Sequence, residues 1–174
     1  MRGAAVLDPD NVDLNWNLAI VLLTAGKYLE GWQAYEARRR LPGFAVNPQK
    51  IPPWPGTALN GKRLLVHAEQ GIGDAIQFCR YLRCLPDNVD DVVFQVPSRL
   101  VPLMGSVRAN VTLTDKAASA HRCDVETPLL SLPHLTGPAD PFALETGCYL
   151  QPDAERLSNW RERLNGHDGP TIAI

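Results

Sequence analysis

The sequence predicts an α/β fold in which a doubly wound parallel sheet carries helices on both faces and follows a helical hairpin. Three observations predict this fold class. After residue 61, short apolar runs alternate with segments of helical periodicity, which indicates strand–helix–strand units. Residues 62–85 read as a strand, a glycine-bearing turn and a helix. Before residue 41, two helical segments flank Gly26, which predicts an αα-hairpin.

The composition narrows the classes of protein to consider. The 174 residues suffice for one domain with a small appendage. Because 17 Lys and Arg stand against 19 Asp and Glu, nothing favours a bulk surface for nucleic acids or anionic membranes. No apolar run approaches the roughly 20 residues that span a bilayer, and the N-terminus does not read as a secretory signal. The four cysteines form no CxxC pair and no histidines stand at metal spacing, so we expect a cytoplasmic protein without a metal site.

The first zone, residues 1–41, is the predicted helical hairpin. Residues 12–25 place apolar side chains at helical spacing, Gly26 breaks this pattern, and residues 28–40 resume it. Gly31 would let the two helix backbones approach closely. A lone hairpin buries too little surface to be stable, so it must dock on the neighbouring domain. We expect three tryptophans to make that contact: Trp16, Trp32 and Trp54.

The second zone, residues 42–60, holds five prolines and reads as an extended linker. Phe44 and Trp54 are its expected anchors on a neighbouring surface, which predicts that the linker is ordered.

The third zone, residues 61–170, is the predicted sheet domain, and residues 171–174 read as the start of a further, truncated strand. Its strands are expected at residues 63–68, 91–96, 111–113 and 124–126. Its helices are expected at residues 75–85, 98–106, 129–135 and 153–165, the last with Asp153 as N-cap.

The turn at residues 69–74 is the first candidate for a chemical site. Open α/β sheets bind ligands at the carboxyl ends of their strands, and free N–H groups at a helix start favour an anion or a polar ligand. Gly71 and Gly73 allow close backbone approach, and Asp74 or Glu69 is a candidate general base. The alternative is structural: Asp74, followed by Gln77, is close to a capping box, and the glycines only serve the turn. No third glycine follows Gly71 and Gly73 at the offset of a dinucleotide-binding motif, so this motif is absent.

Other polar residues have both a functional and a structural interpretation. His67 ends the first strand and either points into the cleft or supports the fold. The run 38–40, three arginines at a helix C-terminus, is typical of residues that complement the helix dipole. Of Asp124 and Glu126, which stand at the expected strand 124–126, we expect at most one to face the cleft. Ser131 lacks the surroundings of a hydrolase nucleophile.

The hairpin resembles a tetratricopeptide repeat. Gly31 and Arg38 depart from its pattern, which usually has alanine at both positions, and such departures suit a terminal repeat. The resemblance implies a protein partner bound through the helical repeat. The residues at matching positions are Leu18, Ala19, Leu22, Gly26, Tyr28 and Tyr35.

The segment HAEQGIGDAIQFCRYL, residues 67–82, is similar to the first strand–turn–helix of the heptosyltransferase-like glycosyltransferases. More closely, the chain resembles bacterial proteins in which tetratricopeptide repeats precede such a region. The match includes residues 30–38, Trp54-Pro55-Gly56 and Pro128–Pro133. This family has the GT-B arrangement of two Rossmann-like halves, and the chain would contain the amino-terminal, acceptor-binding half.

The resemblance implies transfer of a sugar from a nucleotide sugar to a hydroxyl of a glycan or protein acceptor. Asp74 would be the catalytic base. The nucleotide sugar would bind to a second half beyond residue 174, so no cofactor is expected in this chain and it would be inactive alone. The alternatives are a non-catalytic protein-interaction module and a fragment without activity of its own. The acceptor-binding residues would be His67, Glu69, Gln70, Gly71 and Gly73.

Overall fold

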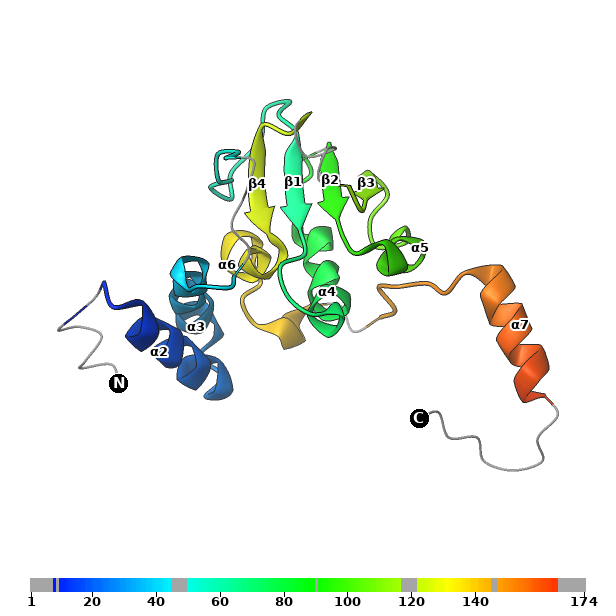
Figure 1. The fold of residues 1–174 in the computed structure, drawn as a ribbon, viewed down its shortest axis with the longest axis horizontal. Helices are drawn as coiled ribbons and strands as arrows, with labels where there is room; N and C mark the ends of the chain where they lie inside the picture. The colour runs from blue at the N-terminus through cyan, green and yellow to red at the C-terminus, as the bar shows by residue number, and fades with distance from the viewer. Residues whose placement is uncertain are drawn as a thin grey trace.

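The computed structural model describes residues 8, 10–44, 50–89, 91–116, 122–144 and 147–165. Its centre is one four-stranded sheet in which all neighbouring strands are parallel, in the order β3-β2-β1-β4 (Figure 1). The predicted parallel sheet is therefore confirmed. The strands are β1 (Leu64–His67), β2 (Val92–Gln95), β3 (Val111–Thr114) and β4 (Val125–Pro128).

The strand order places a topological switch point between β1 and β4. From β1 the chain adds β2 and then β3 on one side, and β4 then joins the other side of β1. Open α/β sheets bind ligands at the carboxyl ends of the strands that flank such a point. Here the helical segments after β1 (residues 72–84) and after β4 (residues 129–136) contact each other. The turn at residues 69–74 directly follows β1 and lies at this point.

The two faces of the sheet are covered differently. Leu64 and Val66 belong to the main core, which most helices join. Leu65 and Val93, on the opposite face, form a small cluster with Ile51 of the linker and Cys123. In the described part of the chain this cluster therefore contains no helical residue, contrary to the expectation of helices on both faces.

The linker also extends the sheet along the outer side of β4. Pro53 bridges Glu126 in a parallel direction, Trp54 N–H donates to the Glu126 carbonyl at 2.7 Å, and Glu126 N–H donates to the Pro52 carbonyl at 2.9 Å. The Trp54 side chain is buried, and its Nε1 donates to the Thr57 carbonyl. The described residues of the linker are therefore ordered, as we expected from the presence of Trp54 as an anchor.

Most predicted helices of the sheet domain are present, but they are short and often tighten into 3₁₀ turns. The expected helix 75–85 begins earlier, at residue 72, and changes to 3₁₀ geometry at Cys79. Cys79 is fully buried, and burial raises the pKa of its thiol to about 12. The segments are α4 (Ile72–Phe78), η2 (Cys79–Cys84), η3 (Ser98–Leu100), α5 (Val101–Met104), η5 (Leu129–Ser131), α6 (Leu132–Thr136) and η6 (Pro141–Ala143).

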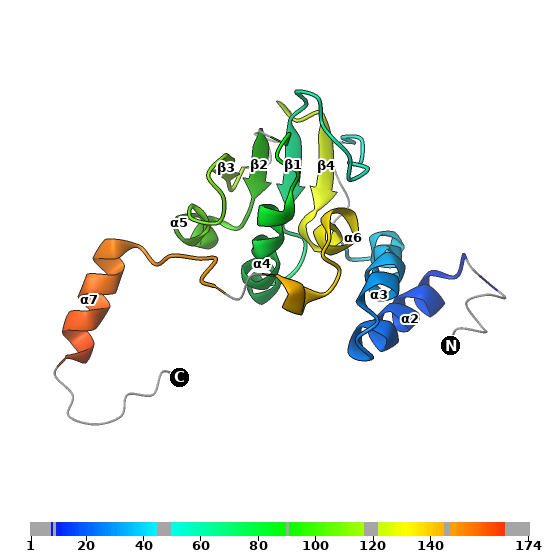
Figure 2. The same ribbon diagram turned by 180° about the vertical axis from the view of Figure 1, so that it is seen from behind.

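The predicted helical hairpin consists of α2 (Val12–Thr24) and α3 (Tyr28–Tyr35), and α3 continues into η1 (Glu36–Arg40). Figure 2 shows α3 beside α6, on the β4 side of the sheet. A Cβ added at Gly31 would meet the Leu23 side chain at 2.7 Å and the Leu23 backbone nitrogen at 3.1 Å. The close approach expected of Gly31 is therefore confirmed.

Of the three tryptophans expected to dock the hairpin, Trp32 makes the clearest contact. Its ring meets Phe78 edge-to-face at 5.6 Å, and its Nε1 donates to the Ala139 carbonyl at 2.7 Å. Trp16 instead packs within the hairpin and against the start of the linker. The centroid of its ring lies 5.0 Å from that of Tyr35 and 5.3 Å from that of Phe44.

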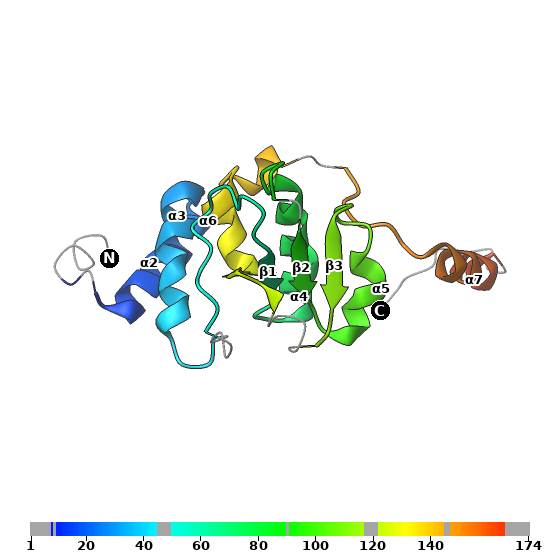
Figure 3. The same cartoon turned by 90° about the horizontal axis from the view of Figure 1, so that it is seen from above.

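Helix α7 (Ala154–Leu164) lies apart from the sheet, at the end of the molecule opposite the hairpin (Figure 3). Asp153 is its N-cap, as predicted, since Oδ1 accepts from Arg156 N–H at 3.0 Å. The helix has no buried residue, and Trp160 is 58% exposed. No described helix combines the length and apolar character needed to cross a membrane. The strand expected at residues 171–174 lies outside the described residues.

Candidate functional site at the carboxyl end of strand β1

Helix α4 begins directly after the glycine-bearing turn, with Gly71 as N-cap. Asp74 is the third helical residue, and its Oδ2 accepts from Gly71 N–H at 3.2 Å. The capping role is confirmed, but the predicted geometry was wrong. Asp74 is the third residue of the helix and accepts from the N-cap Gly71, whereas the prediction had Asp74 as the N-cap and Gln77 as the third residue. Among the described residues, Oδ1 of Asp74 has no hydrogen-bond partner.

Neither glycine of this turn is required by the backbone or by packing. Gly71 has φ −66°, which any residue adopts, and Gly73 has no positive φ. A Cβ added at Gly73 would meet no atom within 4 Å, and one at Gly71 would meet Asp74 Oδ2 at an ordinary 3.4 Å. Both residues are exposed. The missing side chains therefore leave open space above the start of α4.

Behind this turn, a buried ion pair joins the sheet to the hairpin. Arg38 is fully buried, and its Nη2 and Nε donate to the two carboxylate oxygens of Glu69 at 2.6 and 3.1 Å. Glu69 Oε1 also accepts from Leu130 N–H at 3.2 Å. Burial alone would lower the pKa of Arg38, but its hydrogen bonds and charge interactions with Glu69 and Glu36 raise it.

Two further residues complete the surroundings of Arg38. Ser131 Oγ accepts from Arg38 Nη2 at 2.9 Å and donates to Glu36 Oε2 at the same distance. Arg38 Nη1 donates to Glu36 Oε1 at 2.8 Å and to the Tyr35 carbonyl at 3.2 Å. Arg38 does donate to a carbonyl at the end of α3, as the helix-dipole interpretation expects, but it is buried and also binds two carboxylates, which that interpretation did not predict. We call Glu36, Arg38, Glu69 and Ser131 the docking network.

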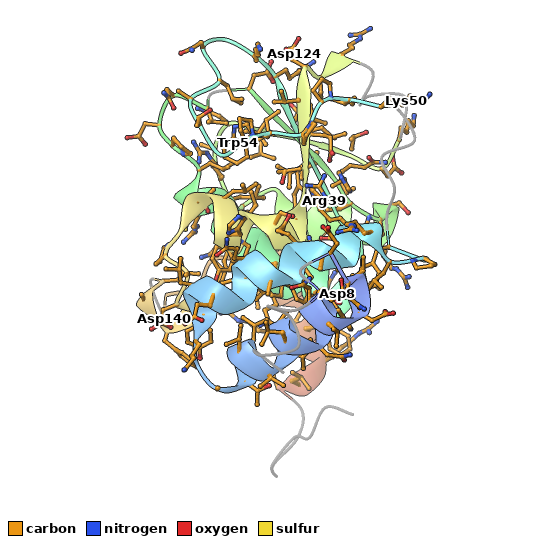
Figure 4. All side chains as sticks on the ribbon, turned by 90° about the vertical axis from the view of Figure 1, so that its left-hand side faces the viewer. Asp8, Arg39, Lys50, Trp54, Asp124 and Asp140 are labelled. Atoms are coloured by element: carbon orange, nitrogen blue, oxygen red, sulfur yellow. The ribbon has the colours of Figure 1, made fainter. Side chains whose placement is uncertain are left out.

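His67 and Glu126 form a second polar contact between β1 and β4. His67 Nε2 lies 2.8 Å from Glu126 Oε2, and Arg39 Nη2 lies 3.3 Å from Glu126 Oε1. The Glu126 side chain is 3% exposed, whereas Asp124 is exposed and accepts from Arg63 N–H. Figure 4 shows Arg39 where the hairpin meets the sheet domain. One of the two alternating carboxylates points inward, as expected, but it is bound by protein groups.

The expected acceptor-binding residues thus separate into two groups. Glu69 and His67 bind protein groups and support the fold. Gly71 and Gly73 are exposed, and Gln70 is partly exposed at the rim, where its Nε2 lies 3.4 Å from the Tyr35 hydroxyl. Burial raises the pKa of this Tyr35 hydroxyl. The described residues contain no group of three potential metal ligands.

The comparisons with known proteins give one distant relationship. The chain is 32% identical over 182 aligned residues to the protein FlbA of Caulobacter vibrioides. The alignment covers 90% of this chain and 30% of FlbA, so the chain spans less than a third of that relative. No protein-family model matches the chain. No solved structure matches it significantly.

Proposed function

We propose that this chain is the acceptor-binding part of a glycosyltransferase-like protein, which transfers a sugar from a nucleotide sugar to a hydroxyl acceptor. The observation that carries the proposal is the open turn at Gly71 and Gly73. Glycine is a poor helix former, so Gly73 inside α4 is unfavourable unless something needs its bare backbone. The surrounding fold does not need it, because nothing occupies the position of the missing side chain.

Asp74 has the arrangement that a general base requires. Its Oδ2 is held by Gly71 N–H, which fixes the orientation of the carboxylate, and its Oδ1 has no partner among the described residues. A positioned carboxylate can take the proton of an acceptor hydroxyl as that oxygen attacks the sugar carbon. The site also lies at the switch point of a parallel sheet, where α/β proteins bind ligands.

Nothing in this arrangement requires a cofactor within the chain. The nucleotide sugar is a co-substrate, and we assign its binding to a part of the natural protein outside these 174 residues. The length of FlbA relative to the aligned region is compatible with such a part. Catalysis needs donor and acceptor held together, so we expect the isolated chain to transfer no sugar.

A second candidate function, a non-catalytic protein-interaction module, is favoured by the docking network. The network covers the carboxyl ends of β1 and β4 with side chains of the hairpin, and Glu69 is thereby removed from any ligand. In that case the turn at Gly71 and Gly73 would be only a surface feature.

Two substitutions in the full natural polypeptide test the first proposal. Asp74→Asn keeps an oxygen that can accept from Gly71 N–H, so the melting temperature should stay the same. Release of nucleoside diphosphate from a panel of nucleotide sugars should fall by about 10²–10⁴-fold, the usual worth of general base catalysis. Gly73→Ala should keep or raise stability, since alanine is the better helix former, and yet lower turnover.

Unchanged turnover in both variants, with the fold intact, would leave Asp74 as a helix cap and remove the reason to place a catalytic site here. A parent protein that releases no nucleoside diphosphate from any donor would instead favour the interaction module.

A further inference from the structure

A cavity of about 330 Å³ lies away from the proposed transfer site, between η2 and the segment that follows α6. Its size is within the range of small-molecule sites, about 300–1,000 Å³. Two arginines stand on one side and mostly apolar side chains on the other. The residues that line it are Arg80, Arg83, Cys84, Pro138, Ala143, Leu144 and Tyr149.

Arg80 is a charged residue without a charged partner. It makes no hydrogen bond or ion pair within the part of the chain that the structure describes, and its Nε is buried without an acceptor. Among the described residues, its guanidinium carbon lies 5.7 Å from the centroid of the Tyr81 ring. A buried donor left unsatisfied costs about 1–3 kcal/mol, and more when the group is charged.

Arg83 adds a second positive charge to the same cavity. Its Nε donates to the Val107 carbonyl at 3.0 Å, which anchors the side chain and leaves both terminal nitrogens without a partner among the described residues. No described carboxylate pairs with either arginine. Cys84 brings no negative charge, because burial raises the pKa of its thiol.

We propose that this cavity binds a small molecule that joins an oxyanion to a compact apolar body. Arginine donates pairs of parallel hydrogen bonds to planar or tetrahedral oxyanions, so a carboxylate and a phosphate share the recognition chemistry. The oxyanion binds the terminal nitrogens of Arg80 and Arg83, both of which line the cavity. The apolar body contacts Leu144 and Tyr149. This site is independent of the proposed sugar transfer.

The test is calorimetric titration of the 174-residue chain with inorganic phosphate and, separately, with benzoate, at low salt. Saturable binding of at least one probe is expected. Arg80→Gln should weaken that binding at least tenfold and Arg83→Gln at least threefold. Arg161→Gln, which removes a charge from the exposed helix α7, should leave it unchanged. If the chain binds benzoate more tightly than phosphate, the natural ligand of the cavity is a carboxylate. If it binds phosphate more tightly, the natural ligand is a phosphate ester.

A second variant keeps the proposal testable if Arg80→Gln fails to fold. Ala143→Trp places a large side chain in the cavity without touching either charge, and it should abolish benzoate binding. The proposal is overturned if neither probe binds saturably to the parent chain. It is also overturned if folded Arg80→Gln and Ala143→Trp bind as tightly as the parent.

Discussion

The hairpin and helix α7 are both helical additions to the sheet, yet only the hairpin is docked. Trp32 of the hairpin is 7% exposed and hydrogen-bonded to a loop of the sheet domain, whereas Trp160 of α7 is 58% exposed. Each segment carries a large aromatic residue, so an apolar side chain alone does not fix a helix on the sheet. The hairpin also brings Arg38, whose donors match acceptors that the sheet domain presents at Glu69 and Ser131.

The largest expected effect comes from removing each segment in turn. Deletion of residues 1–41 removes the cation that pairs with Glu69 and exposes the surface under Trp32. The melting temperature should fall by more than roughly 10 °C, since a protein of this size loses about 2–4 °C per kcal/mol. Deletion of residues 151–174 should change it by less than about 2 °C. Differential scanning calorimetry measures both, and equal effects would remove the distinction between the two segments.

Arg38→Met isolates the docking network from the rest of the hairpin. Removal of one partner of a buried ion pair costs about 3–5 kcal/mol, because the other charge stays buried and uncompensated. Urea unfolding measures the loss, and Arg40→Met is the matched control on the exposed side of the same turn. A loss below about 1 kcal/mol for Arg38→Met would mean that apolar packing alone docks the hairpin.

Gly31→Ala tests the contact inside the hairpin. The added methyl group would lie 2.7 Å from a Leu23 side-chain carbon, so the helices must separate or Leu23 must move. Overpacking of this kind costs about 1–3 kcal/mol, and the free energy of unfolding should fall by that amount. Gly73→Ala is the control, since its methyl group meets no atom. Similar stability of the two variants would show that Leu23 moves aside freely.

The smallest effect is expected in α7. Trp160→Ala removes a 58% exposed ring from a helix without buried residues, where the Arg163 guanidinium carbon lies 5.3 Å from the ring centroid. The free energy of unfolding should change by less than about 0.5 kcal/mol, as for most surface substitutions. Trp32→Ala, in contrast, should cost about 3–5 kcal/mol. A large loss for Trp160→Ala would indicate that α7 packs on the sheet in solution.

Local patterns predicted most of the fold because strands and helices here follow the periodicity of their own residues. Strands β1 and β2, for example, lie within the predicted ranges 63–68 and 91–96. Exact helix ends were less predictable. The helix changes to 3₁₀ geometry at Cys79, and the segment that follows, η2, contacts α6 from a distant part of the chain.

The candidate site was only partly predictable for a related reason. The position of Asp74 beside Gly71 follows from three residues of local sequence. The pairing of Arg38 with Glu69 joins residues 31 positions apart, and the arginine run that contains Arg38 has an ordinary local explanation. The cavity at Arg80 was missed because a segment more than 50 residues later forms its other wall. Nothing in the local sequence around Arg38 or Arg80 indicates that either side chain is partly or fully buried. That burial follows from the topology, which brings distant segments against them.

The docking network also constrains how the protein can change by recombination. Tetratricopeptide-like hairpins are exchangeable units when each one contacts only its helical neighbours. This hairpin supplies Arg38 and Glu36 to a serine and a glutamate of a different domain. A hairpin transplanted from a repeat protein would therefore have to bring a glutamate and an arginine two positions apart. The docking network thus joins the segment from α2 to β4 into one structural unit.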